Sequence, residues 1–225
     1  MIIHPLSYVF SSIFVVVSLI EIIAAFNELE TLRKVVKPFS MFFLALAALI
    51  TLPQHPLIYC GALLGMFGDI LLINNQKRSY FMIGTVAFLL GHLCYISEIL
   101  FVMMKAQPLS WWFYVVVAFS ILLIVLGAYP LSKKLTNNRY LALLGNTYLS
   151  MLVLVTVVAT IASFNGFANY MVLGILGGIS FLASDLILTK ATFIKDFKRR
   201  DYYIMLFYLL GQAFIITGLS LTYIL

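Results

Sequence analysis

The sequence is poor in charged residues. Only 10% of its 225 residues are Asp, Glu, Lys or Arg, whereas 64% are hydrophobic and the mean hydropathy is +1.10. Soluble domains usually contain about 25% charged and about 45–50% apolar residues. The composition therefore excludes a water-soluble globule and favours an integral membrane protein. The length suits one compact unit, residues 1–225.

Cysteine is also scarce, and a secretory leader is not apparent. Cys60 and Cys94 both fall in apolar runs, so we interpret them as small buried hydrophobes and expect no disulfide. The opening stretch MIIHPLSYVF lacks the basic residues that begin a signal peptide. Because the apolar run after it is long enough to cross a bilayer, we expect it to remain in the mature protein as the first helix.

The sequence lacks motifs for cofactors and for common hydrolases. It contains no HExxH, CxxC, phosphate-binding or dinucleotide-binding loop, and no GxSxG elbow. The three histidines are far apart in the sequence, which gives no metal-ligand spacing. We therefore expect neither a metal nor a cofactor.

Long apolar runs dominate what is present. A membrane-spanning helix needs about 20 mainly apolar residues, and the period-two alternation of a membrane barrel is absent. The predicted fold class is all-α, a polytopic membrane protein with eight transmembrane helices. Breaks at charged residues, prolines and asparagines delimit the runs at 6–25, 38–51, 56–73, 80–103, 110–131, 140–162, 169–189 and 202–225.

The basic residues predict the orientation. Thirteen of the fourteen Lys and Arg fall in alternate connections, and only Lys105 falls in another. Because positive loops stay in the cytoplasm, we expect both termini outside, in the bacterial cytoplasmic membrane. The net charge of +6 then indicates contact with a membrane surface and no nucleic acid. The thirteen are Arg33, Lys34, Lys37, Lys77, Arg78, Lys133, Lys134, Arg139, Lys190, Lys195, Lys198, Arg199 and Arg200.

Two short segments recur in register. FLLGH at 88–92 corresponds to YLLGQ at 208–212, and GDILL at 68–72 corresponds to SDLIL at 184–188. The separations are 120 and 116 residues, and the longer loop at 190–201 accommodates the difference. We therefore predict two parallel four-helix repeats, approximately 1–105 and 106–225, because an even number of helices per half preserves orientation.

Asp69 and Asp185 occupy corresponding positions inside apolar runs. An ionised side chain at the bilayer centre costs at least about 2.5–3.5 kcal/mol, so such residues usually face a polar interior and mark function. The alternative for either residue alone is a helix cap or a pair with a loop lysine. Because the two match, we favour a shared site, about five residues from the cytoplasmic loops.

Further polar residues lie on the same helices. His92 and Tyr95 share one face of their helix, as do Tyr208 and Gln212. Together with the aspartates they predict one polar pocket open to the cytoplasmic side. A lone histidine such as His92 is more often a hydrogen-bonded core residue than a catalyst. We expect a structural role for Glu98 and assign no role to Glu21. The glycine pairs Gly61/Gly65 and Gly174/Gly178 have the spacing that is typical of close helix packing.

The chain resembles the YhhN family of lysoplasmalogenase-like membrane proteins. The matching residues run in order along most of the sequence, with a small departure at Leu188–Thr189, where the family often has Leu-Ala. They are Lys37–Pro38, Gly68–Asp69 with Leu72, FLLGHLCY at 88–95, Tyr148, Ser184–Asp185 with Leu188, Phe193, and the pair Tyr208 and Gln212.

The resemblance implies hydrolysis of the vinyl ether of lysoplasmalogens, a lysophospholipid substrate, without a cofactor. Asp69, Asp185 and His92 would be catalytic: one carboxylic acid protonates the alkene, the other stabilises the cation, and the imidazole relays the proton. Lys37 would meet the lipid phosphate. The expected substrate-binding residues are Lys37, Tyr95, Tyr148, Ser184, Tyr208 and Gln212.

Two functions of other classes remain open from the sequence. A small-molecule or proton-coupled transporter also uses parallel repeats and buried acids, but carriers often bind at Gly- or Pro-broken helices. The runs at 80–103, 169–189 and 202–225 contain no proline. A lysolipid-binding protein without enzymatic activity is the second alternative.

Overall fold

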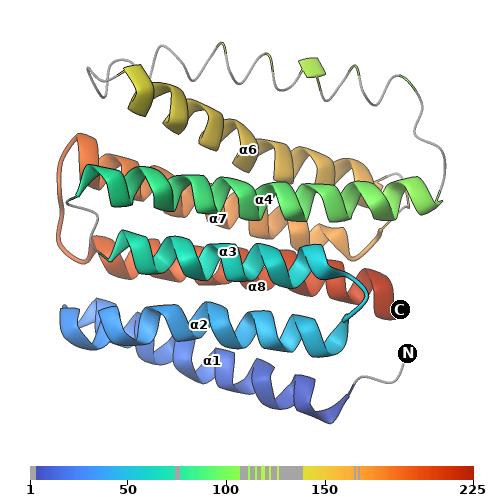
Figure 1. Ribbon diagram of the computed structural model, residues 1–225, viewed down its shortest axis with the longest axis horizontal. Helices are drawn as coiled ribbons and strands as arrows, with labels where there is room; N and C mark the ends of the chain where they lie inside the picture. Colours follow the sequence, from blue (N-terminus) through green and yellow to red (C-terminus); the bar gives the residue numbers. More distant parts are fainter. Residues whose placement is uncertain are drawn as a thin grey trace.

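The computed structural model describes residues 4–73, 77–106, 139–164 and 168–225, with isolated positions between them. Every regular element in this part of the chain is an α-helix. The predicted helix at 110–131, with Lys133 and Lys134 after it, lies outside the described residues. The helices are α1 (Pro5–Phe26), α2 (Glu30–Thr51), α3 (Pro56–Leu72), α4 (Arg78–Ala106), α6 (Arg139–Phe164), α7 (Met171–Phe193) and α8 (Arg200–Ile224) (Figure 1).

The described helices are those of a polytopic membrane protein. Six of them are long and apolar enough to cross a bilayer, and α3 is a shorter apolar helix of 17 residues. Large apolar side chains such as Val16, Leu19 and Ile23 of α1 are exposed on the outer surface. Since water would penalise that surface, the all-helical membrane class is confirmed. The count of eight spans and the four-helix repeats stay predictions.

The second helix begins earlier than the sequence predicts. The expected start was residue 38, but α2 starts at Glu30, so Lys37 and Pro38 lie two turns inside it. The error came from treating charges as breaks. Lys34 bonds Glu30 one turn back at 2.8 Å, and Arg33 pairs with Asp201 of α8 at 3.1 Å, so the charged turns are stable as a helix.

The seventh helix also runs further than predicted. It continues through Lys190 to Phe193, so Lys190 belongs to the helix and not to the loop. A cation in the last turn is favourable beside the helix carbonyls, which explains why it does not end the helix. Asp185 therefore lies two turns before the end of α7, whereas Asp69 lies three residues before the end of α3.

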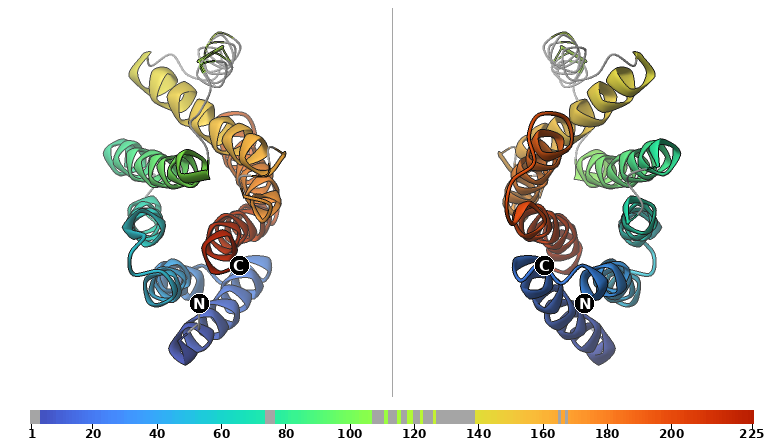
Figure 2. Two further views of the ribbon diagram at one scale, coloured as in Figure 1. Left: turned by 90° about the vertical axis from the view of Figure 1, so that its right-hand side faces the viewer. Right: turned by 90° about the vertical axis from the view of Figure 1, so that its left-hand side faces the viewer.

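The helices form two facing rows. Seen end-on, α2, α3 and α4 line one side and α6, α7 and α8 the other, with α1 packed against α2 and α8 (Figure 2). Helices α4 and α6 join the rows at the opposite edge. The start of α1 and the end of α8 lie at the same end of the bundle, and α3 runs in the same direction as α7 (Figure 1).

Glycines allow close contacts between neighbouring helices within each row. A methyl group on Gly91 of α4 would lie 3.0 Å from the carbonyl oxygen of Gly61 in α3. A methyl group on Gly211 of α8 would lie 3.1 Å from the carbonyl oxygen of Gly177 in α7. These positions correspond under the separations of 116 and 120 residues, so the pairs α3–α4 and α7–α8 pack through equivalent contacts.

Candidate functional site

A buried ion pair lies between α2 and α3. The Lys37 ammonium is 3.2 Å from Oδ1 of Asp69, and both side chains are buried. Tyr208 of α8 donates its hydroxyl to Oδ2 of the same carboxylate at 2.6 Å. One cation and one strong donor therefore hold Asp69, and both stabilise its ionised form.

The second aspartate has different neighbours. Tyr148 of α6 donates its hydroxyl to Oδ2 of Asp185 at 2.7 Å, and no described cation contacts this carboxyl. Asp185 nevertheless lies within electrostatic range of Lys37 and Asp69. Beside it, Ser184 is fully buried and donates to the carbonyl of Ile204 at 3.0 Å. The two aspartates thus face one cluster, and Ser184 ties α7 to α8.

His92 is held with one nitrogen unused. Its Nδ1 lies 2.7 Å from the carbonyl oxygen of Phe88, and since a carbonyl only accepts, Nδ1 carries the proton. Nε2 is then a bare acceptor, and it is buried with no partner in the described chain. The ring packs edge-on to Phe181 at 4.4 Å between centroids and to Tyr148 at 6.1 Å. His92 therefore offers a lone pair near the Tyr148–Asp185 pair.

Tyr95 and Gln212 bond to each other across the bundle. The Tyr95 hydroxyl donates to Oε1 of Gln212 at 2.8 Å, and both side chains are buried. Gln212 Nε2 and the Tyr208 hydroxyl both approach Gly65 of α3, each 3.4 Å from where a methyl group on this glycine would lie. The pair therefore continues the polar cluster from Asp69 along α8.

Sequence reasoning missed Phe181, and it left Glu21 without a role. Phe181 stacks edge-on against His92, Phe88 and Tyr208, so it packs the centre of the cluster. An aromatic residue in an apolar run gives no signal of such a position. Glu21 of α1 is fully buried and accepts a hydrogen bond from Ser40 at 2.6 Å. An acid within an apolar run was the available signal, but no matching residue drew attention to it.

A separate polar cluster joins α4 to α8 and to the connection before α3. His55 contacts Oε1 of Glu98 at 2.7 Å, and Tyr223 donates to the same oxygen at 2.6 Å. The rings of His55 and Tyr223 stack with centroids 3.6 Å apart. Glu98 therefore serves a structural network, as expected from the sequence, and it lies toward the opposite end of α4 from the basic loops.

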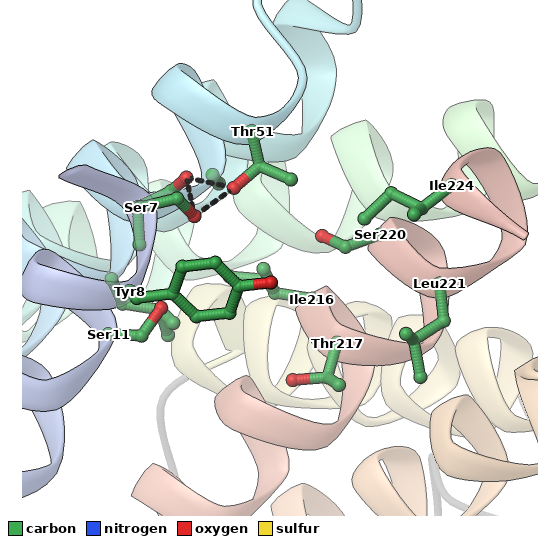
Figure 3. Close-up of a pocket in the computed structure, with 12 residues that line it drawn as sticks. Ser7, Tyr8, Ser11, Thr51, Ile216, Thr217, Ser220, Leu221 and Ile224 are labelled. Carbon is green, nitrogen blue, oxygen red and sulfur yellow. Dashed lines mark hydrogen bonds between the residues drawn. The ribbon is translucent and has the colours of Figure 1, made fainter. Parts of the chain in front are cut away.

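A cavity of about 170 Å³ opens between α1, α2 and α8 (Figure 3). Its lining carries hydroxyl groups and aliphatic side chains but no carboxyl, imidazole or ammonium group. None of the candidate site residues lines it, so it offers no acid for catalysis. The hydroxyl groups belong to Ser7, Tyr8, Ser11, Thr51, Thr217 and Ser220, of which Ser7 and Thr51 bond to each other.

The arrangement suits acid–base chemistry. Two buried carboxyl groups lie within electrostatic range, one matched to a cation and the other only to a phenol. Carboxyl pairs in unlike environments divide into an acid and a stabilising anion. Within the described residues no cluster of three His, Cys, Asp or Glu side chains is placed to hold a metal ion.

Comparison with known proteins gives one match. Residues 32–219 match the model of the YhhN family. The matched range contains every candidate site residue and excludes the whole of α1, including Glu21. Neither the search of curated proteins nor the search of solved structures found a match.

Proposed function

Because the chain belongs to the YhhN family, we propose that it is a membrane hydrolase that cleaves the vinyl ether of lysoplasmalogens. The products are a fatty aldehyde and a glycerophospho-base. The observation that carries the proposal is the pair of buried carboxyls, Asp69 and Asp185, with unlike partners and within electrostatic range of each other.

The unlike partners assign the two roles. Asp185 is the general acid, because without a contacting cation it can hold the proton that the outer alkene carbon must receive. Protonation there creates an oxocarbenium ion. Asp69 is the stabilising anion, because Lys37 and Tyr208 keep it ionised and its charge then lowers the energy of the cation. The division resembles that of paired carboxylates in glycoside hydrolysis.

Water completes the reaction, and His92 is suited to direct it. The bare Nε2 of His92 can accept a hydrogen bond from the attacking water. The water adds to the carbon that bears the ether oxygen and its proton passes to the Asp185 carboxylate, which gives a hemiacetal and restores the acid. In the collapse, Asp185 donates a proton to the leaving ether oxygen and takes up the proton of the hemiacetal hydroxyl. The aldehyde and the glycerophospho-base are released, and the site ends with the protons it began with.

The substrate-binding residues belong to the same proposal. Tyr95, Tyr148, Ser184, Tyr208 and Gln212 line or brace the cluster from four helices. The structure changes the expectation for Lys37, since its ammonium is engaged by Asp69 and a lipid phosphate would have to share it. We therefore assign Lys37 first to holding Asp69 ionised.

The topology is proposed with the function. The protein would have eight spans in two parallel halves, lie in the bacterial cytoplasmic membrane with both termini outside, and open its site to the cytoplasm. The helix starts that carry Arg33, Arg78 and Arg200 share the end opposite the termini (Figure 1). Labelling of single cysteines placed at Lys77 and at Lys105 by an impermeant reagent tests this orientation, since only Lys105 should be reached from outside.

One assay separates the proposed enzyme from the alternatives. Purified protein in detergent is given a lysoplasmalogen, and aldehyde release is measured for the parent, Asp69→Asn and Asp185→Asn. Asn keeps the side-chain shape but neither donates the proton nor carries the charge. We expect the Asp185 variant to lose about 10²–10⁴-fold in kcat and the Asp69 variant to lose a comparable factor.

The outcomes distinguish three functions. Aldehyde release that falls in both variants supports the hydrolase. Binding of the lysolipid without any release would indicate a binding protein, and substrate movement across proteoliposomes without hydrolysis would indicate a transporter. Near-normal turnover in both Asn variants would rule out the two-carboxylate mechanism.

A further inference from the structure

Glu21 brings a third carboxyl to the cluster from a helix that the family match does not cover. Its side chain is fully buried in α1, where nearly all neighbours in sequence are apolar. Oε2 accepts the Ser40 hydroxyl at 2.6 Å, whereas Oε1 has no partner in the described chain. A buried carboxylate with a bare oxygen is costly, and a protonated carboxyl is much less so.

The groups around Glu21 connect it to the candidate acid–base pair. Ser40 lies one helical turn beyond Lys37 on α2, and Glu21 interacts electrostatically with Asp69 of α3, with Lys37 and with Arg33. Tyr208 of α8, which donates to Asp69, also lies within electrostatic range of Glu21. These are the charged and titratable groups that α2, α3 and α8 present to Glu21, together with Asp201, which holds Arg33.

The charges of the cluster do not balance unless carboxyls hold protons. Three carboxyls of the cluster are buried, Glu21, Asp69 and Asp185, and of these three only Asp69 contacts the buried ammonium of Lys37. Arg33 forms an ion pair with Asp201 at 3.1 Å, so its charge is already balanced by a carboxylate outside these three. Since an unpaired buried charge is strongly unfavourable, Lys37 neutralises one carboxylate and the remaining carboxyls stay protonated. Asp69, which contacts the ammonium, is the ionised one.

We propose that Glu21 is a proton-holding positioning residue: it sits beside the Lys37–Asp69 pair and its protonation state sets the charge on Asp69. When Glu21 is neutral, the Lys37 ammonium forms an ion pair with Asp69 alone. When Glu21 loses its proton, it competes for the same ammonium and its negative charge opposes that of Asp69. The consequence for catalysis rests on the proposed hydrolase function; the proton on Glu21 does not.

Infrared spectroscopy tests the proton directly. A protonated carboxyl has a carbonyl stretch well separated from that of a carboxylate, so purified protein near neutral pH should show such absorption from Glu21 and from Asp185. Glu21→Gln should remove the Glu21 component and leave that of Asp185. Ser40→Ala, which keeps Glu21 but deletes the donor to its carbonyl oxygen, should move the Glu21 component to higher frequency. Absence of any band assignable to Glu21 in these comparisons would overturn the proposal.

The pH profile of aldehyde release tests the coupling to Asp69. Activity should fall on the alkaline side, where Glu21 loses its proton and its negative charge competes with Asp69 for Lys37. Gln at position 21 stays neutral at every pH, so this competition does not arise. The alkaline limb should therefore move up by about one pH unit, the size expected for a neighbouring like charge. KM should change less than the profile does.

Glu98→Gln is the matched control, because it removes a buried carboxyl on α4 that belongs to the His55–Tyr223 network. Its alkaline limb should coincide with that of the parent. A Glu21→Gln alkaline limb that also coincides with that of the parent would refute the coupling. If the parent itself releases no aldehyde, the proposed function fails, while the infrared comparison still decides whether Glu21 holds a proton. If Glu21→Gln does not fold, the Ser40→Ala band shift carries the test.

Discussion

Replacing Lys37 by methionine should destabilise the folded protein by about 3–5 kcal/mol. The ammonium and the Asp69 carboxylate are 3.2 Å apart, with side-chain exposures of 8% and 2%. At an effective dielectric constant of about 20, unit charges at this distance attract by about 5 kcal/mol. Methionine fills a similar volume, so the loss reports the charge left on Asp69 and not a cavity.

The pH sets how much of that loss appears. At low pH Asp69 can take up a proton, and a neutral carboxyl without a cation costs less than a charged one. The destabilisation should therefore be smaller in acid and grow as the pH rises. The free energy of unfolding is measured in mixed micelles with increasing denaturing detergent, at several pH values, for Lys37→Met, Asp69→Asn and the double variant.

The double variant decides whether the two residues act as a pair. With both charges removed no isolated charge remains, so Lys37→Met/Asp69→Asn should be more stable than Lys37→Met alone. If the two single losses simply add in the double variant, the residues do not interact. If Lys37→Met is as stable as the parent at every pH, the buried ion pair contributes nothing and the charge account of the cluster is wrong.

Four further variants and a substrate analogue test neighbouring parts of the structure and the mechanism. His92→Gln should reduce aldehyde release less than the aspartate variants do, because it removes an acceptor for water and not the acid; equal loss would make His92 essential. Glu98→Gln should lower thermal stability, measured by intrinsic fluorescence, and leave turnover unchanged. Gly177→Ala should lower stability because its methyl group would lie 2.8 Å from the carbonyl oxygen of Gly211, whereas Gly145→Ala, which meets no described atom within 4 Å, should not. A saturated ether analogue should inhibit competitively, since it lacks the alkene carbon; processing of that analogue would contradict the mechanism.

The helices were predictable because hydrophobic length alone determines where a chain can cross a bilayer. Every described helix corresponds to a predicted run, and most ends agree within a few residues. The predicted helix ends were wrong where a charged residue was taken as a boundary. The first two turns of α2, from Glu30 to Lys37, and the end of α7 at Lys190 are helical despite their charges, because local pairs and the helix carbonyls accommodate them.

The partners within the site were less accessible from sequence. Recurrence singled out Asp69 and Asp185, and the structure brings both to one cluster. Nothing in the spacing indicated that Lys37 bonds Asp69 or that Tyr148 bonds Asp185, because those contacts depend on how α2 and α6 pack. Glu21 was harder still, since its role follows from a count of buried charges that only a three-dimensional arrangement supplies.

The predicted repeat gives a reason for the difference between the two carboxyls. The helix pairs α3–α4 and α7–α8 pack through equivalent glycine contacts, and Asp69 and Asp185 occupy corresponding positions in them. The side chains around them then diverge: Tyr208, which donates to Asp69, corresponds to Phe88, which has no hydroxyl to offer. A perfect repeat would give both acids the same partners and the same tendency to ionise. Acid catalysis beside a stabilising anion requires them to differ, and the loss of one hydroxyl, with a lysine on only one side, provides that difference.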